Sequence, residues 1–282
     1  MTSQSTAGAE SAPIAEIGVI GGSGFYTFLD DARRVAVDTP FGPPSDDVVI
    51  GSVGGRSVAF LARHGQGHRF PPHRVNYRAN LWALRCVGVR QVLAPCAVGA
   101  LKPEFGPGTV VVPDQVVDRT WGREHTVYDE PGAVVHVGFA DPYCPTGRAS
   151  VLDAARDDAD LPPVDGGTLV VINGPRFSSR AESQWHQAAG WSVVGMTGMP
   201  EASIARELAM CFTSVCLVTD ADAGVEGHPG VTHEEVLAVF ATKVEHLKDL
   251  VRRTIAQLPP VDDSNCECRN ALDGITLPFE LP

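Results

Sequence analysis

The amino-acid sequence predicts an α/β protein built around a largely buried β-sheet. Short runs rich in β-branched residues alternate along the chain with stretches whose apolar residues recur at helical spacing. Two glycines between two such runs, Gly54 and Gly55, are a strong signal for a β-hairpin. No internal repeat and no Pro-, Gly- or Ser-rich linker divides the 282 residues, so we expect a single domain.

Strands are expected where short apolar runs end at turn residues or polar loops. The first, residues 16–20, leads into the glycines at positions 21, 22 and 24, and the next two flank the hairpin turn. The runs that meet this description are residues 16–20, 48–53, 56–61, 89–93, 109–112, 168–172, 192–196 and 213–218.

Helical spacing marks four segments. The longest lies near the end of the chain, where Val236, Phe240, Val244 and Leu247 recur at helical intervals before a pair of prolines at 259–260. The other three are residues 75–87, 180–189 and 200–210.

The two ends of the chain lack this periodicity. Residues 1–13 have neither the basic start nor the apolar stretch of a signal peptide, and we expect a disordered leader. The folded domain is expected over residues 14–260. Residues 261–282 are expected to form an irregular tail, whose apolar patch at 275–281 could pack over the active site.

The composition excludes several classes of function. Hydrophobic residues make up 44% of the chain and charged residues 20%, as in a globular protein with a full core. The net charge of -12 argues against a surface that binds nucleic acid. No apolar run is long enough for a membrane helix. Seven scattered cysteines, an odd number, fit a reducing compartment, so we expect a cytoplasmic enzyme.

Two of the cysteines stand close together in the tail. Cys266 and Cys268 could form a local disulfide or hold a metal ion. Because no second cysteine pair lies near them in the sequence, we expect an ordinary tail and no metal site.

The glycine-rich loop at residues 21–24 follows the first predicted strand. Its backbone N–H groups and the hydroxyl of Ser23 could close on an anion. A dinucleotide-binding loop is the alternative. It requires a third glycine at position 27, where the chain has Thr27 between bulky aromatic residues.

Polar residues follow three more predicted strands. Arg63 and His64 could bind phosphate through a guanidinium fork and an imidazole donor. A solvated loop would explain a lone Arg-His pair equally well, but the glycine-rich spacing around this one favours a functional role. Phe177 could stack on a flat base and Thr197 could donate to an anion. The alternatives are core packing for Phe177 and Met196 and a helix cap for Thr197.

Asp220 and Asp222 follow the strand predicted at residues 213–218. Because they alternate along an extended chain, their side chains are expected on the same side. Such a pair is either a cation site or a pair of hydrogen-bonding groups, and no further oxygen ligands follow in the next residues. Crowding of two carboxylates favours retention of one proton, which a purine leaving group could take at N7.

In this order the motifs resemble the methylthioadenosine phosphorylase branch of the trimeric purine nucleoside phosphorylase family. The resemblance extends from about residue 17 to 258, and eight motifs in the same order make it specific. They are IGVIGGSG, DTPFGPPSD, ARHGQGH, VNYRANLWAL, PGTVVVPDQVVDRT, GPRFSSRAES, GMTGMPEA and VTDADAG.

The resemblance implies a central mixed sheet flanked by helices, a homotrimer with active sites near subunit contacts, and phosphorolysis of 5′-methylthioadenosine. It implies inorganic phosphate as co-substrate and no metal or organic cofactor. The residues that it assigns to phosphate are Ser23, Arg63, His64 and Thr197. Those that it assigns to the nucleoside are Met196 at the ribose, Phe177 and Ser178 at the adenine, Asp220 as donor to N7, and Asp222 as acceptor from the 6-amino group.

The chain departs from the family pattern at three positions. Cys96 stands where methylthioadenosine phosphorylases usually offer phosphate a threonine, and Gly195 replaces a larger polar residue. The third departure is His233, which resembles the ligand of the 5′-hydroxyl in the purine nucleoside phosphorylase branch. His136, by contrast, agrees with the pattern, since it matches a histidine near the 5′ substituent in methylthioadenosine phosphorylases.

Other functions therefore stay open at the level of sequence. Adenosine, inosine or guanosine could replace methylthioadenosine as substrate. A dinucleotide-binding oxidoreductase and a hydrolytic nucleosidase are the weaker alternatives.

Overall fold

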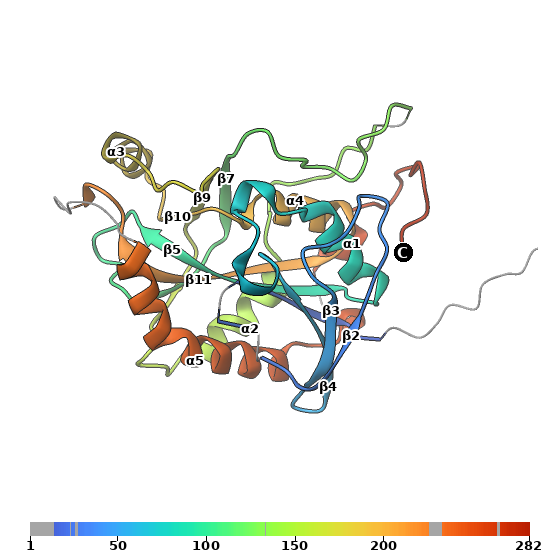
Figure 1. Cartoon of the computed structure of the whole chain (residues 1–282), viewed down its shortest axis with the longest axis horizontal. Coiled ribbons are helices and arrows are strands. Elements are labelled where there is room, and N and C mark those ends of the chain that lie inside the picture. Colours follow the sequence, from blue (N-terminus) through green and yellow to red (C-terminus); the bar gives the residue numbers. More distant parts are fainter. Residues whose placement is uncertain (1–13, 23, 26–27, 133, 226–232, 264–265) are drawn as a thin grey trace, which may run out of the picture.

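A ten-residue strand, β5 (Gln91–Ala100), passes through the centre of a mixed β-sheet (Figure 1). This computed structural model describes residues 14–22, 24–25, 28–132, 134–225, 233–263 and 266–282. Within them, eleven strands form one sheet that contains both parallel and antiparallel pairs. The predicted α/β class and central mixed sheet are confirmed.

The strands follow the order β2-β3-β4-β1-β5-β10-β9-β7, while β11 pairs with β5 and β6, and β6 pairs with β8. The ten strands besides β5 are β1 (Ile17–Gly21), β2 (Asp30–Val35), β3 (Val48–Val53), β4 (Arg56–Ala62), β6 (Val110–Val112), β7 (Gln115–Arg119), β8 (Pro163–Asp165), β9 (Thr168–Ile172), β10 (Val193–Gly195) and β11 (Cys211–Ala221).

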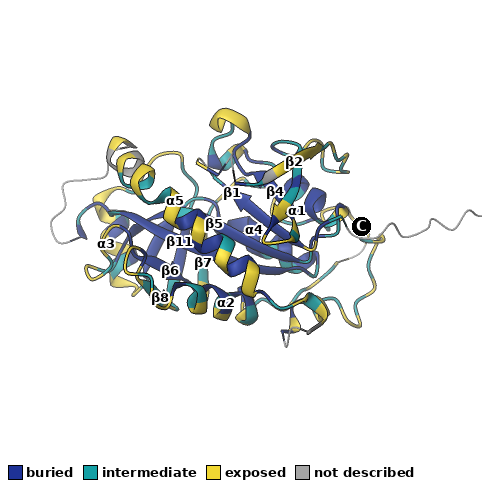
Figure 2. Cartoon of the chain, turned by 90° about the horizontal axis from the view of Figure 1, so that it is seen from below, coloured by how far each residue is buried: buried dark blue, intermediate teal, exposed yellow. Residues whose placement is uncertain are grey.

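Helices cover both faces of the sheet. Helices α1 (Tyr77–Cys86) and α4 (Gly198–Glu207) pack on one face, and α2 (Pro145–Ala155) and α5 (His233–Gln257) pack on the other (Figure 1). A fifth helix, α3 (Arg180–Ala188), lies at one end of the sheet. The central strands are buried while the helices expose their outer sides (Figure 2), so each face of the sheet has its own hydrophobic core.

The two neighbours of β5 on one side leave a gap between them. β1 runs parallel to β5 and its last pair is Val19 with Leu93, whereas β10 runs antiparallel and pairs with Gly99 and Ala100. The carboxyl ends of β1 and β10 therefore approach residues 95–98 of β5 from opposite directions. On its other side β5 pairs with β11 along its whole length.

Pro95 lies inside β5, although the sequence predicts that this strand ends at residue 93. Its carbonyl accepts a hydrogen bond from Nη1 of Arg63 at 3.1 Å, on the side where the gap lies. Because the nitrogen and carbonyl of an extended residue point to the same side, the missing N–H of Pro95 also faces the gap. No bond to β11 is lost, and the strand continues.

The sequence does not predict β2, β7, β8 or α2. In α2 the helical pattern is weakened by Gly147 in the first turn, where glycine disfavours helix. A Cβ at this position would lie 2.0 Å from Oγ1 of Thr213 in β11. Gly147 therefore allows α2 to pack closely against the sheet, a tertiary requirement that local sequence does not express.

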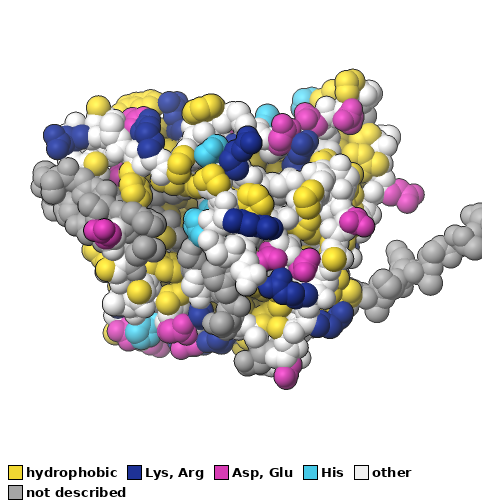
Figure 3. All heavy atoms as spheres, in the orientation of Figure 1, with side chains coloured by type: hydrophobic (Ala, Val, Ile, Leu, Met, Phe, Trp, Pro, Cys, Tyr) yellow, Lys and Arg dark blue, Asp and Glu magenta, His cyan; other side chains and the backbone are white. Residues whose placement is uncertain are grey.

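The C-terminal tail packs on the outside of α1. Phe279 stacks on Tyr128, with ring centroids 5.2 Å apart, and meets Trp82 edge-on at 5.7 Å. The predicted leader, residues 1–13, lies outside the described residues. Among the described helices, none has both the length and the hydrophobicity needed to cross a bilayer. On the face shown in Figure 3, Lys and Arg side chains are interspersed with Asp and Glu.

Candidate active site

The gap beside β5 opens into a cavity of about 450 Å³. Its walls come from the loops that follow β1, β4, β9 and β10 and from the end of β11. Ligands of α/β proteins bind where strands end and neighbouring connections diverge, which is the geometry found here. The cavity lies within the size range of small-molecule sites.

Residues 95–99 of β5 form one wall of the cavity and separate two chemically different ends. At the Pro95 end lies the guanidinium of Arg63. At the Gly99 end lie Asp220 and Asp222, since a Cβ on Gly99 would be 2.9 Å from Oδ2 of Asp220. Four residues of strand place the two ends roughly 13 Å apart.

Arg63 is buried, and Glu201 at the start of α4 holds its guanidinium. Nε and Nη2 donate to the two carboxylate oxygens at 2.6 and 3.1 Å, and further bonds reach the carbonyls of Ile20 and Pro95. Burial alone would lower the pKa of Arg63, but the Glu201 carboxylate raises it, so the guanidinium is charged. The fork expected for phosphate is thus occupied, and Nη1, the end nearest Gly22, remains to face a ligand.

His64 presents an acceptor to the cavity, where the sequence suggests a donor. Its Nδ1 lies 2.8 Å from the carbonyl of Phe70, so Nδ1 carries the proton and Nε2 does not. Burial, followed by the charge of Arg63, lowers the pKa of His64 to about 3. The neutral ring stacks on His68, with centroids 4.1 Å apart. Nε2 is suited to accept a hydrogen bond from the hydroxyl of a monohydrogen phosphate.

Thr197 is the residue before α4, but its hydroxyl caps no backbone N–H of that helix. The helix-cap alternative is therefore wrong, and this nearly buried hydroxyl lines the cavity. The sulfur of Met196 packs closely against Gly174, and Met196 also lines the cavity.

Phe177 and Ser178 form a further part of the wall. Phe177 is 36% exposed and lines the cavity, so core packing does not explain it. The hydroxyl of Ser178 is buried and has no hydrogen-bond partner within the described part of the protein. A buried polar group without a partner is costly, which favours a ligand that bonds to Ser178.

The two aspartates line the same cavity, as predicted, but each has its own hydroxyl partner. Oδ1 of Asp220 accepts from Oγ1 of Thr219 at 2.7 Å. Oδ2 of Asp222 accepts from Oγ of Ser183 in α3 at 2.6 Å. Each of these carboxylates is thus held by a hydroxyl donor.

Two residues that shape the site escape sequence reasoning. Glu201 is one, and the only local signal for it is an acidic residue in the first turn of a helix. Arg123 is the other. It donates to the carbonyls of Asn173, Met196 and Met199 at 2.6–2.8 Å, and so fixes the loops after β9 and β10.

Cys96 lines the cavity where the family pattern has a threonine. Its sulfur lies 3.6 Å from that of Cys216 and 3.8 Å from Oγ of Ser214. The hydrogen bond with Cys216, together with the charge of Arg63, lowers the pKa of the Cys96 thiol.

Three predicted site residues are not brought to the cavity by the described structure. Ser23 lies outside the described residues, and His233 begins α5 but its side chain is not described. His136 is exposed and does not line the cavity of its own chain. No described residue of the tail, 261–282, lines it either. The expected packing of the tail over the active site is therefore not seen within the described part of one chain.

The dinucleotide alternative is wrong. That motif requires a helix directly after the first strand, whereas β1 is followed by β2 without a helix among the described residues. Gly24, with φ +92°, allows the loop to approach α5, because a Cβ there would lie 2.8 Å from Val244.

The cavity can thus hold an anion at one end and a flat, polar heterocycle at the other, as in enzymes that act on nucleosides. The sequence pattern of the phosphorylase superfamily matches residues 16–256. The chain therefore belongs to the phosphorylase superfamily.

Individual relatives are similar over almost their full length. The chain is 62% identical over 275 residues to a purine nucleoside phosphorylase of Streptomyces coelicolor, covering 95% of this chain and 98% of that protein. It is 55% identical over 268 residues to an S-methyl-5′-thioadenosine phosphorylase of Mycolicibacterium smegmatis, covering 94% and 99%.

Solved structures have the same fold. A methylthioadenosine phosphorylase from an antarctic soil metagenomic library is 38% identical, with a TM-score of 0.86 over 93% of this chain and 92% of that one. The methylthioadenosine phosphorylase of Schistosoma mansoni in complex with adenine is also 38% identical, with a TM-score of 0.80 over 86% and 91%.

Replacing Glu201 by Gln should lower the free energy of unfolding by about 3–5 kcal/mol, because Arg63 would remain as a buried, uncompensated charge. Urea denaturation measures this. Asp249→Asn is the control, since Asp249 and its partner Arg252 both have solvent-exposed side chains and the loss of this pair should cost less than about 1 kcal/mol. Equal losses in the two variants would contradict the role of the buried pair.

The low pKa of His64 predicts a pH-dependent stability. Between pH 6.5 and about 3 the unfolded chain binds a proton at His64 that the folded chain does not. The free energy of unfolding should therefore decrease as the pH is lowered below 6.5, by up to about 1.4 kcal/mol per pH unit from this group. His64→Gln should flatten the dependence between pH 6.5 and 5, whereas the exposed His246→Gln should keep the wild-type slope. A wild-type slope in His64→Gln would refute the low pKa.

Proposed function

We propose that this protein catalyses the phosphorolysis of 5′-methylthioadenosine to adenine and 5-methylthioribose 1-phosphate. The observation that carries the proposal is one cavity with Arg63, His64 and Thr197 at its anion end and two aspartates at its other end. The roughly 13 Å between these ends suits a ribose placed between phosphate and base. The similarity to phosphorylases named for this substrate adds to this support.

In the proposed reaction the C1′–N9 bond breaks as a phosphate oxygen bonds to C1′ from the opposite face. Thr197 and Nη1 of Arg63 donate to phosphate, and Nε2 of His64 accepts a hydrogen bond from the phosphate hydroxyl. Held next to the ribose, the anion stabilises the positive charge that develops there. No residue of this scheme calls for a metal or an organic cofactor.

The base leaves as neutral adenine when N7 is protonated. We assign this proton to the carboxyl group of Asp220, which lines the base end of the cavity and whose Oδ1 accepts a hydrogen bond from Thr219. Asp222, oriented by Ser183, accepts from the 6-amino group. Phe177 provides the face on which the ring stacks, and Ser178 gains a partner for its buried hydroxyl.

Adenosine is the second candidate substrate. A protein 62% identical to this chain is named a purine nucleoside phosphorylase, and His233, which resembles a ligand of the 5′-hydroxyl, begins α5. In favour of the methylthio group, the apolar side chains of Phe25 and Phe240 line the cavity beside Gly22. Inosine and guanosine fit two carboxylates less well, since a 6-oxo group is an acceptor.

We further propose that the chain forms a homotrimer in which His136 serves a neighbouring subunit. His136 is exposed here, and the large apolar side chains of Trp121 and Val134 in the same segment are 74% and 77% exposed. Apolar surface of this kind favours burial in an interface. Light scattering on the purified protein measures the assembly.

Adenine release from methylthioadenosine should depend on phosphate, with adenosine a poorer substrate and inosine poorer still. Thr197→Val should raise KM for phosphate about 10-fold, the loss of one hydrogen bond, and leave KM for the nucleoside within about two-fold. Thr242→Val, an exposed threonine of α5, is the control. Full-rate release without phosphate would show a nucleosidase, and preference for inosine would refute the adenine specificity.

Asp220→Asn should reduce kcat for methylthioadenosine by about 10²- to 10⁴-fold, because an amide cannot protonate N7. KM for phosphate should change little, since the two ends of the cavity are separate. Asp118→Asn on the exposed strand β7 should behave as wild type. A kcat for Asp220→Asn within three-fold of wild type would remove Asp220 from the catalytic role.

A further inference from the structure

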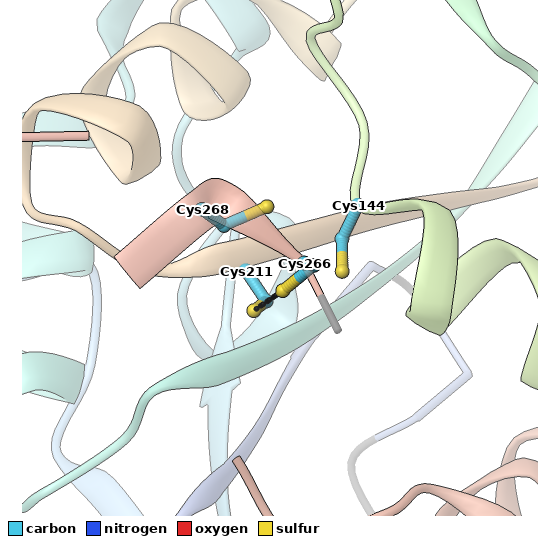
Figure 4. A group of neighbouring side chains, drawn as sticks. All are labelled: Cys144, Cys211, Cys266 and Cys268. Atoms are coloured by element: carbon cyan, nitrogen blue, oxygen red, sulfur yellow. Dashed lines mark hydrogen bonds between the residues drawn. The ribbon is translucent and has the colours of Figure 1, made fainter. Parts of the chain in front are cut away.

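Four cysteines that lie far apart in the sequence meet in the folded chain, away from the active site. Cys144 precedes α2, Cys211 begins β11, and Cys266 and Cys268 belong to the turn at the start of the tail. Figure 4 shows their side chains converging from these three segments. The second cysteine pair that is missing from the sequence around the tail is thus supplied by tertiary structure.

The positions of the sulfurs fit one shared ligand. All four Sγ atoms lie within 4.8 Å of one another, and those of Cys211 and Cys266 are 3.3 Å apart. In a tetrahedral ZnS₄ centre with Zn–S bonds of about 2.3 Å, neighbouring sulfurs are about 3.8 Å apart. Closing the four sulfurs around a zinc ion therefore requires only small side-chain movements.

The surroundings suit thiolate ligands. Each of the four cysteines is at most 4% exposed, so solvent does not compete for a bound ion. The backbone N–H of Gly147 donates to Sγ of Cys144 at 3.5 Å, and Cys144 stands at the N-terminus of α2, where the helix dipole favours negative charge. Four cysteines are a typical set for a structural zinc site.

We propose that Cys144, Cys211, Cys266 and Cys268 bind one structural zinc ion. The site has four protein ligands and no open position, which excludes a catalytic role for the ion. It lies at the opposite end of β11 from Asp220, roughly 30 Å away by the rise of an extended strand. The ion joins the tail to the sheet and to α2, three segments that local contacts alone would hold less firmly.

Two disulfides are the alternative state of the same residues. A disulfide needs its sulfurs only in pairs, at about 2.05 Å, with the two pairs independent of each other. Here all seven cysteines are thiols, and the four sulfurs are mutually close, as a common central ion requires.

The metal content of the purified full-length protein, prepared with reductant and without added chelator, tests the proposal. We expect about one zinc per chain, released by a zinc-binding dye only after the thiols are modified. Cobalt(II) added to the metal-free protein should give the intense visible absorption of tetrahedral thiolate coordination. Thiol titration of the unfolded, metal-free protein should find all seven cysteines reduced.

Cys266→Ser combined with Cys268→Ser should lower the zinc content at least about 10-fold and reduce Tm by several degrees, because two of the four ligands are lost. The control Cys86→Ser changes an exposed cysteine outside the cluster and should keep full zinc content and Tm. The wild-type measurements stand even if the double variant does not fold. Three outcomes would overturn the proposal. The wild-type protein could contain no zinc and bind no cobalt, or it could contain iron in place of zinc. Titration could also find only three thiols, which would mean that the four cysteines form two disulfides.

Discussion

The active site depends on one buried ion pair, between Arg63 at the end of β4 and Glu201 at the start of α4. Removing two charges from water is unfavourable unless their remaining hydrogen bonds are satisfied, and here the carbonyls of Ile20 and Pro95 complete them. The guanidinium therefore connects the ends of β1 and β4 and the middle of β5 with a helix on one face of the sheet. Burial, followed by the charge of this guanidinium, lowers the pKa of His64 and keeps it neutral.

Around this pair, the pairing of β5 sets the shape of the cavity. Because β1 and β10 run in opposite directions and both stop short, the middle of β5 lacks a neighbour on one side. The loops that leave the two strands supply groups of different chemistry to the same space. Arg123 fixes the loop after β10 by donating to backbone carbonyls, so it shapes the site without lining the cavity.

β11 relates two functions that are well separated in space. Its carboxyl end carries Asp220 at one end of the cavity, while its first residue, Cys211, belongs to the cysteine cluster. Catalytic groups must keep hydrogen-bonding capacity for a substrate, whereas in a four-cysteine centre all four thiolates are bound to the ion. Placing them at opposite ends of the longest strand keeps a strongly bound cation away from an anion site.

The α/β class, most strands and helices, and eight of the residues that line the cavity can be predicted from the amino-acid sequence. The strands and helices follow from β-branched runs and helical periodicity, and the site residues follow from their place at strand ends together with the family resemblance of their motifs. Three features of the site become visible only in the folded chain: Glu201 holds Arg63, His64 accepts rather than donates, and Arg123 orders two loops. The fold also brings the four distant cysteines together. These features depend on burial and on contacts between segments far apart in the chain, which no local pattern encodes.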